Sequence, residues 1–242
     1  MTVRATAPEV RSAPSTHDGR RHAILAIDTA TSRVVIATGS PDGVADGLAS
    51  WVVGYRHGET LLPSIGQFLA EQNIRRSRLV GIVVGSGPGA FTGLRVGMAT
   101  AKGMAHGLGI PLVGVSTAEA LLTAVDGHEG RTLVLLLPAG SSDRVVVRPG
   151  QAPRRLAGGL ELDLADDELL VAVDLDGRAP ADAVARGERA RDGLGQALLR
   201  LGAARLREAA HGELATLVPE YVTLPRGVQP AQGSVAWSRD PR

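Results

Sequence analysis

The order of the hydrophobic patterns between residues 22 and 116 constrains the fold of this chain most. The predicted elements are strands at 22–28, 33–39 and 47–55, a helix at 57–74, a strand at 79–85, a helix at 92–107 and a strand at 110–116. A meander of strands followed by alternating helices and strands is typical of a mixed sheet covered by helices. The sequence therefore predicts an α/β protein whose first lobe holds a mixed five-stranded sheet.

A weaker repeat of this pattern follows residue 130. Its predicted parts are a hairpin at 131–138 and 144–149, a strand at 166–175 and helical segments at 187–210. These segments predict a smaller, degenerate second lobe. The expected division is a disordered extension at 1–21, a first lobe at 22–116, a second lobe at 117–224 and a flexible tail at 225–242.

The composition excludes several classes of function. The 242 residues include 26 basic and 25 acidic side chains, so no general positive field would hold a nucleic acid, and aromatic residues make up only 2% of the chain. Cysteine is absent, which excludes disulfides and thiolate metal ligands and fits a reducing compartment. No apolar run approaches the roughly 20 residues of a membrane span. We expect a soluble, cytoplasmic protein.

The segment "GSGPGAFTGLRVGMATAKGMAHG" (85–107) raises the question of a phosphate-binding loop. It matches neither the Gly-x-x-x-x-Gly-Lys-Ser/Thr pattern nor Gly-x-Gly-x-x-Gly. A strand that enters a helix through glycines still directs free amides outward, so anion binding at Gly87 and Gly89 stays open.

The helix in this segment carries small residues four positions apart. They are Gly93, Gly97, Ala101 and Ala105, with Leu94 and Met98 beside them. Glycine inside a helix costs roughly 1 kcal/mol relative to alanine, and close packing is what compensates for it. The packing partner is either a helix of another subunit or the sheet of the same chain.

Asp28 ends the first predicted strand, and Thr29 follows it. A carboxylate at a strand end can hold Mg²⁺ beside a nucleotide, and it can equally cap a turn through its own backbone. A turn that clasps phosphate would favour glycine where this chain has Ala30. The sequence thus predicts at most a poor nucleotide site.

No catalytic or metal-binding arrangement emerges from residue spacing. The six histidines form no His-x-x-x-His pair, and nothing suggests a Ser-His-Asp set. His57, just before a helix, is expected to make hydrogen bonds at the helix start or at an interface.

Four segments in order resemble the bacterial TsaB family: "ILAIDTAT", "RHGETLLP", "GSGPGAFTGLRVGMATAKGMA" and "GIPLVGVSTAEAL", which together cover about 22–122. Beyond residue 130 the similarity is thin. The Asp and Arg of the family's Asp-Ala-Arg motif are missing from "LPAGSSDRVVV", and a Pro-x-Tyr-Leu-Arg motif survives only as Pro219, Glu220 and Tyr221.

This resemblance implies an actin-like (ASKHA, RNase H-like) two-lobe fold and a paralogue of TsaD that kept the fold and lost the active site. It also implies a heterodimer with TsaD through the helices of the first lobe, or a homodimer through the same helices. The complex, joined by the ATPase TsaE, would support threonylcarbamoyl transfer to the tRNA adenosine beside the anticodon. No intrinsic cofactor is implied, and ATP with magnesium would belong to the complex.

Two hypotheses follow. The preferred one is a scaffold without intrinsic activity, and its predicted interface residues are His57, Leu61, Ile65, Phe68, Phe91, Gly93, Leu94, Gly97, Met98, Ala101 and Ala105. Leucine at Gly97 is then expected to abolish TsaD binding and leave the melting transition in place. The alternative is an ATP-dependent enzyme that uses Asp28 for Mg²⁺ and the Gly87-Pro88-Gly89 turn for phosphate.

Overall fold

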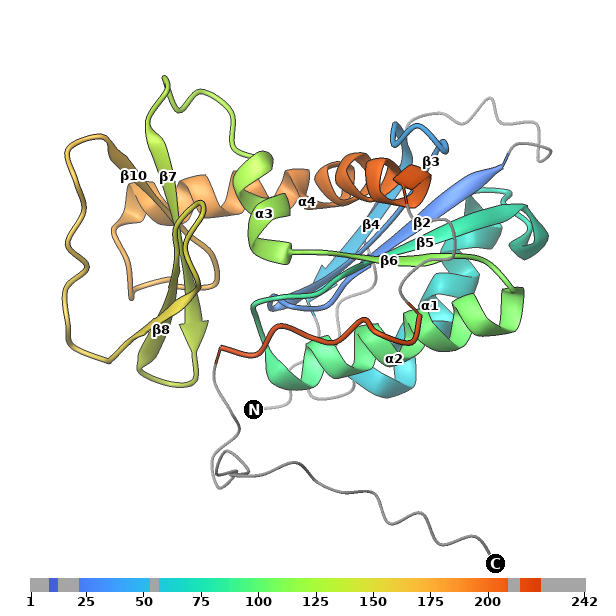
Figure 1. Ribbon diagram of the computed structural model, residues 1–242, viewed down its shortest axis with the longest axis horizontal. Helices are drawn as coiled ribbons and strands as arrows, with labels where there is room; N and C mark the ends of the chain where they lie inside the picture. Colours follow the sequence, from blue (N-terminus) through green and yellow to red (C-terminus); the bar gives the residue numbers. More distant parts are fainter. Residues whose placement is uncertain (1–8, 13–21, 53–56, 209–213, 223–242) are drawn as a thin grey trace, which may run out of the picture.

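The computed structural model describes residues 9–12, 22–52, 57–208 and 214–222. Within them the chain forms two β-sheets that stand side by side and are bridged by one long helix (Figure 1). No helix of this described part is long and apolar enough to cross a membrane.

The first sheet has the strand order β1-β4-β3-β2-β5-β6. The bounds of its predicted strands are β2 (Ala23–Asp28), β3 (Arg33–Gly39), β4 (Ala45–Val52), β5 (Leu79–Gly85) and β6 (Leu112–Val115). β2, β3 and β4 form an antiparallel meander, whereas β5 and β6 run parallel to β2. The central strand β2 is buried along its whole length, as its uninterrupted apolar run indicates. The predicted mixed five-stranded sheet of an α/β protein is confirmed.

A sixth strand, β1 (Glu9–Ser12), pairs with β4 at the edge of this sheet. The prediction of a disordered extension over residues 1–21 is therefore wrong for these four residues. The sequence "EVRS" is too short and polar to indicate a strand, and the pairing depends on the free edge that β4 offers. Residues 1–8, 13–21 and the predicted flexible tail at 225–242 lie outside the described residues.

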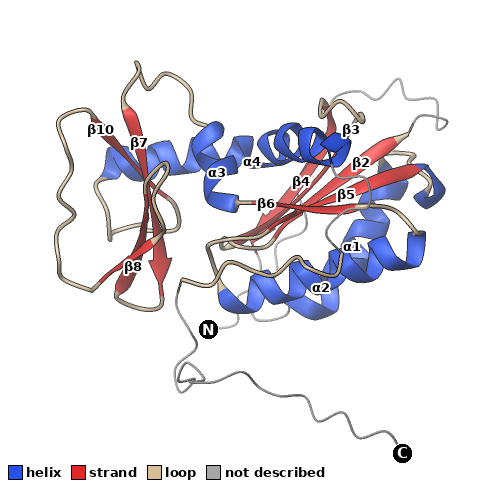
Figure 2. Ribbon diagram, viewed as in Figure 1, coloured by secondary structure: helices blue, strands red, loops and turns tan. Residues whose placement is uncertain are grey.

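Helices cover both faces of the first sheet (Figure 2). α1 (His57–Glu71) and α2 (Phe91–Leu108) lie on one face, and their inner side chains share a hydrophobic cluster with that face. α3 (Thr117–Thr123) and α4 (Ala181–Glu208) lie on the other. A short 3₁₀ helix, η1 (Arg76–Arg78), leads from α1 into β5.

The second sheet has the order β10-β7-β8-β9. Its strands are β7 (Thr132–Ala139), β8 (Asp143–Val147), β9 (Arg154–Leu156) and β10 (Glu168–Ala172). The predicted β7–β8 hairpin is confirmed, and β10 joins it in parallel with β7. The sequence did not predict β9, because "RRL" carries no strand pattern of its own.

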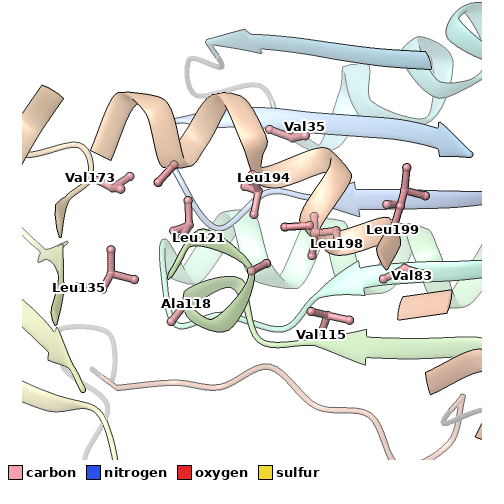
Figure 3. Packing of buried hydrophobic residues seen from close by; sticks show 14 of the residues in the cluster. Val35, Val83, Val115, Ala118, Leu121, Leu135, Val173, Leu194, Leu198 and Leu199 are labelled. Carbon is pink, nitrogen blue, oxygen red and sulfur yellow. The ribbon is translucent and has the colours of Figure 1, made fainter. Parts of the chain in front are cut away.

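α4 joins the two sheets into one core. Its 28 residues extend about 42 Å, from β10 at its first turns to the first sheet beyond. Figure 3 shows Leu194 and Leu198 of α4 packed near Leu121 of α3, between strands of the two sheets. The predicted boundary at residue 116 thus divides two sheets but not two independent hydrophobic cores.

Candidate functional site

Asp28 lies at the end of β2 and has no exposed surface. The Ala30 amide donates to its Oδ1 (2.8 Å), and the Thr117 hydroxyl donates to its Oδ2 (2.6 Å). The first bond is that of an Asx turn. Both carboxylate oxygens are therefore engaged inside the chain, which favours the turn-capping interpretation of Asp28 over a magnesium ligand.

Burial raises the pKa of the Asp28 carboxyl from 3.8 to about 6. The hydrogen bonds from Thr117 and Ala30 oppose this effect, and the negative charge of Asp174 adds slightly to it. The folded protein thus favours the protonated form of Asp28 more strongly than the unfolded chain does.

The stability of the fold should consequently depend on pH through Asp28. Because its folded pKa exceeds the unfolded value, the stabilisation is complete below about pH 4 and disappears as the pH rises through 6. The difference corresponds to about 3 kcal/mol of unfolding free energy at neutral pH. We expect Asp28→Asn to remove this dependence, as measured by urea unfolding of both proteins between pH 4 and 8. If the unfolding free energies of wild type and Asp28→Asn changed in parallel with pH, folding would not raise the pKa of Asp28.

Contacts with Thr29 and Ala30 account for the glycines in and just before the first turns of α2. The Thr29 hydroxyl donates to the Gly93 carbonyl oxygen (2.7 Å). A β-carbon at Gly93 would overlap the Thr29 carbonyl oxygen, one at Gly97 would overlap the Thr29 hydroxyl, and one at Gly89 would overlap the Ala30 carbonyl oxygen. These glycines let the β2–β3 turn lie directly against the start of α2, so the close packing that compensates for their cost is internal to the chain.

The Gly87-Pro88-Gly89 turn is fixed by hydrogen bonds to the start of α3. The Gly87 amide donates to the Thr117 hydroxyl oxygen (3.2 Å), and the Gly87 carbonyl accepts from the Thr117 amide (2.7 Å) and the Ser116 hydroxyl (3.1 Å). The amide of Ala90, which follows the turn, donates to the Ala30 carbonyl (2.7 Å). The structure thus gathers Asp28, Gly87 and Thr117 as a packed junction, in which the Gly87 amide is already engaged.

Most of the predicted interface residues lie inside the subunit. Seven side chains are at most 4% exposed and two glycines are buried: Leu61, Ile65, Phe68, Leu94, Met98, Ala101, Ala105, Gly93 and Gly97. The prediction that this face of α2 meets a partner is wrong, because the helix's own sheet and the β2–β3 turn cover it. Helical spacing reveals an apolar or small face but not what packs on it.

Two further predicted interface residues have different environments. Phe91 is half-buried at the start of α2, with its ring centroid 4.9 Å from that of Tyr221 and 5.0 Å from the Arg95 guanidinium carbon. α1 begins at His57, but the side chain of His57 lies outside the described part of the structure.

A groove of about 580 Å³ lies between the outer surfaces of α1 and α2. We call it the α1–α2 groove, and its lining residues are Leu62, Ile65, Gly66, Leu69, Arg76, Ala99, Thr100, Gly103, Met104, Gly107 and Leu108. Ile65 and Leu69 are buried and form its floor, whereas Leu62 on the rim is 55% exposed. The lining is apolar apart from Thr100 and Arg76.

The outer face of α2 carries a second stripe of small residues, Ala99, Gly103 and Gly107. A β-carbon at Gly103 or Gly107 would meet no atom within 4 Å. Their spacing of four residues was visible in the sequence, but it equals that of Gly93 and Gly97 and therefore could not show which stripe is open.

A larger hollow of about 640 Å³ lies between α3 and the second sheet. It is lined by side chains of both charges, including Glu119, Glu220, Arg131 and Arg148. Burial raises the pKa of Glu220, whereas the ion pair with Glu168 (2.6 Å) engages Arg148. The charged side chains that line this hollow are therefore both acidic and basic. Within the described residues, no group of three or more His, Cys, Asp or Glu side chains is placed to hold a metal ion.

A charged network joins the β2–β3 turn to the loop after β10 and to α4, and the sequence did not reveal it. The carboxylate of Asp174 accepts from the amide (2.6 Å) and hydroxyl (2.5 Å) of Ser32. It also pairs with Arg191 of α4, which in turn pairs with Glu188. The Arg191 side chain is only 7% exposed and that of Asp174 11%. We call these four residues the interlobe network.

Residues 46–227 match the family model described as "TsaD: tRNA N6-adenosine threonylcarbamoyltransferase". This match covers most of the chain.

Two curated relatives illustrate the similarity. A Mycobacterium tuberculosis protein described as uncharacterized is 42% identical over 99 residues, which are 40% of this chain and 47% of that protein. The tRNA threonylcarbamoyladenosine biosynthesis protein TsaB of Escherichia coli is 33% identical over 112 residues, 46% of this chain and 48% of that protein. The matches thus span about half the length of these relatives.

Solved structures share the fold. "YeaZ from Pseudomonas aeruginosa" aligns with a TM-score of 0.58 and 22% identity over 83% of this chain and all of that one. A second Pseudomonas aeruginosa structure, described as similar to the peptidase YeaZ, aligns with a TM-score of 0.61 and 21% identity over 84% of this chain. These likenesses concern the fold alone.

Proposed function

Because the chain belongs to the TsaD family, and within it to the TsaB proteins, we propose that it is a non-catalytic scaffold that binds a TsaD catalytic subunit. In this role it supports transfer of the threonylcarbamoyl group to the adenosine beside the anticodon of tRNA. ATP, magnesium, the ATPase TsaE and tRNA then belong to the assembled complex.

The observation that carries this proposal is the α1–α2 groove. It is an apolar hollow on two neighbouring helices, with an exposed leucine on its rim and open glycines along one wall. A helix of another subunit can approach such a wall closely and bury apolar surface on both sides. By contrast, the Asp28 carboxylate and the Gly87 amide are engaged inside the chain. These features support a binding role better than an ATP-dependent reaction.

The proposed interface therefore lies on the outer face of α2 and not on the inner face that the sequence predicted. We propose that TsaD contacts Leu62, Ala99, Gly103 and Gly107, and that a second copy of the chain occupies the same groove when TsaD is absent.

Leucine at Gly103 is expected to block complex formation and to preserve the fold. The new side chain would fill the groove, while the space around the Gly103 β-carbon position leaves the subunit undisturbed. We expect co-purification with TsaD of the same organism to fall below detection and the melting temperature to be no lower than that of wild type. Ala185→Leu, at an exposed site on α4, is the matched control and should bind normally.

Modification of tRNA by the reconstituted proteins tests the function itself. With TsaD, TsaE, Mg-ATP, threonylcarbamoyl adenylate as the donor and tRNA present, omission of this chain should abolish formation of threonylcarbamoyladenosine, and Gly103→Leu should reproduce the omission. Normal binding and modification by Gly103→Leu would refute the groove as the interface. Undiminished modification without the chain would refute the scaffold role.

A further inference from the structure

From the position of Arg76 in the α1–α2 groove we infer that this residue recognises a carboxylate of the partner protein and so sets the register of docking. This inference rests on the function proposed above. It adds a chemical requirement for the partner, namely an acidic side chain beside the apolar surface that enters the groove.

The backbone places Arg76 at the edge of the groove. Residue 76 opens η1, directly after the turn that ends α1, and its guanidinium reaches back to the middle of α1. There one guanidinium nitrogen lies 3.5 Å from the position that a β-carbon of Gly66 would take. This separation is an ordinary van der Waals distance, and it places the guanidinium on the wall of the groove.

Among the described residues that line the groove, Arg76 is the one ionisable residue. It is exposed, and none of the ion pairs or side-chain hydrogen bonds found in the described residues involves it. Its donors are therefore available to a partner. Arg75 is also exposed, yet it does not line the groove.

An apolar groove and a single charge have different roles in recognition. Apolar contacts between helices tolerate sliding, because neighbouring turns present similar surfaces. A guanidinium donates its strongest hydrogen bonds to an anionic acceptor of matching geometry, so such a pair removes that freedom and favours partners that carry the charge.

A carboxylate suits this position better than an RNA phosphate. Binding to a nucleic-acid backbone normally uses several cations along the path of the strand. The groove offers one cation, with apolar walls that include Leu62, Met104 and Leu108. Such walls match a protein helix with one acidic residue near its contact face.

Charge reversal provides the test. Full-length Arg76→Glu and Arg75→Glu carry the same change in net charge, and calorimetry with TsaD of the same organism measures both. We expect Arg76→Glu to raise the dissociation constant about tenfold or more and Arg75→Glu to change it less than about threefold. Increasing the salt concentration should weaken binding of wild type more than binding of Arg76→Gln. Thermal unfolding of each variant should match wild type, since Arg76 makes no internal ion pair.

The possible failures are distinguishable. If Arg76→Glu binds TsaD normally while Gly103→Leu does not, the groove is the interface and the inference about Arg76 is refuted. If Arg76→Glu and Gly103→Leu both bind TsaD normally, the proposed interface is refuted as well. If Arg76→Glu binds TsaD normally but the complex loses affinity for tRNA, the guanidinium contacts phosphate and the inference is likewise refuted.

Discussion

Alanine at Gly93 is expected to lower the unfolding free energy by about 3 kcal/mol and the melting temperature by roughly 10 °C. The added β-carbon would overlap the Thr29 carbonyl oxygen, which belongs to the backbone of the β2–β3 turn and cannot rotate away. The hydrogen bond from the Thr29 hydroxyl to the Gly93 carbonyl would be lost as the turn is displaced. Chemical denaturation and calorimetric melting measure the effect.

Gly103→Ala is the matched control in the same helix. Its β-carbon would meet no atom within 4 Å, so only the better helix propensity of alanine acts there. We expect this variant to be more stable than wild type by about 1 kcal/mol. Equal stabilities for the two alanine variants would show that the β2–β3 turn does not lie against α2. The contact between Gly97 and Thr29 also changes the sequence-based expectation for Gly97→Leu. This variant should now lower the stability of the fold as well as binding.

Asparagine at Asp174 is expected to destabilise the protein by about 3 kcal/mol. The change removes the charge that compensates Arg191, whose buried guanidinium then keeps only the exposed Glu188 as an anionic partner. Asparagine tolerates the left-handed backbone at this residue (φ +57°), so the variant tests the charge and not the turn. Urea unfolding gives the free energy, and hydrogen exchange at Ser32 reports the contact between the turn and the loop after β10.

A double-mutant cycle separates the ion pair from other effects. Arg191→Met removes the buried cation and leaves an apolar chain of similar length. If the interlobe network acts as described, Asp174→Asn combined with Arg191→Met should cost clearly less than the sum of the single changes. Strict additivity would contradict the coupling of Asp174 with Arg191.

Much of the fold was accessible from sequence because its signals are local. Apolar runs predicted β2 and β5, and the Gly87-Pro88-Gly89 turn marked the end of β5. β1 was not predicted because its four residues depend on the edge of β4 for their pairing. The span of α4 over both sheets likewise depends on distant contacts, although its helical pattern was visible.

The same distinction between local signals and distant contacts applies to the candidate site. By itself, the sequence determined that α2 carries small residues at a spacing of four and that its first turns pack closely against something. Only the tertiary structure decided that Gly93 and Gly97 face the β2–β3 turn while Gly103 and Gly107 face the open α1–α2 groove. The physical reason is that helical periodicity fixes which residues share a face, whereas burial of that face depends on elements distant in sequence.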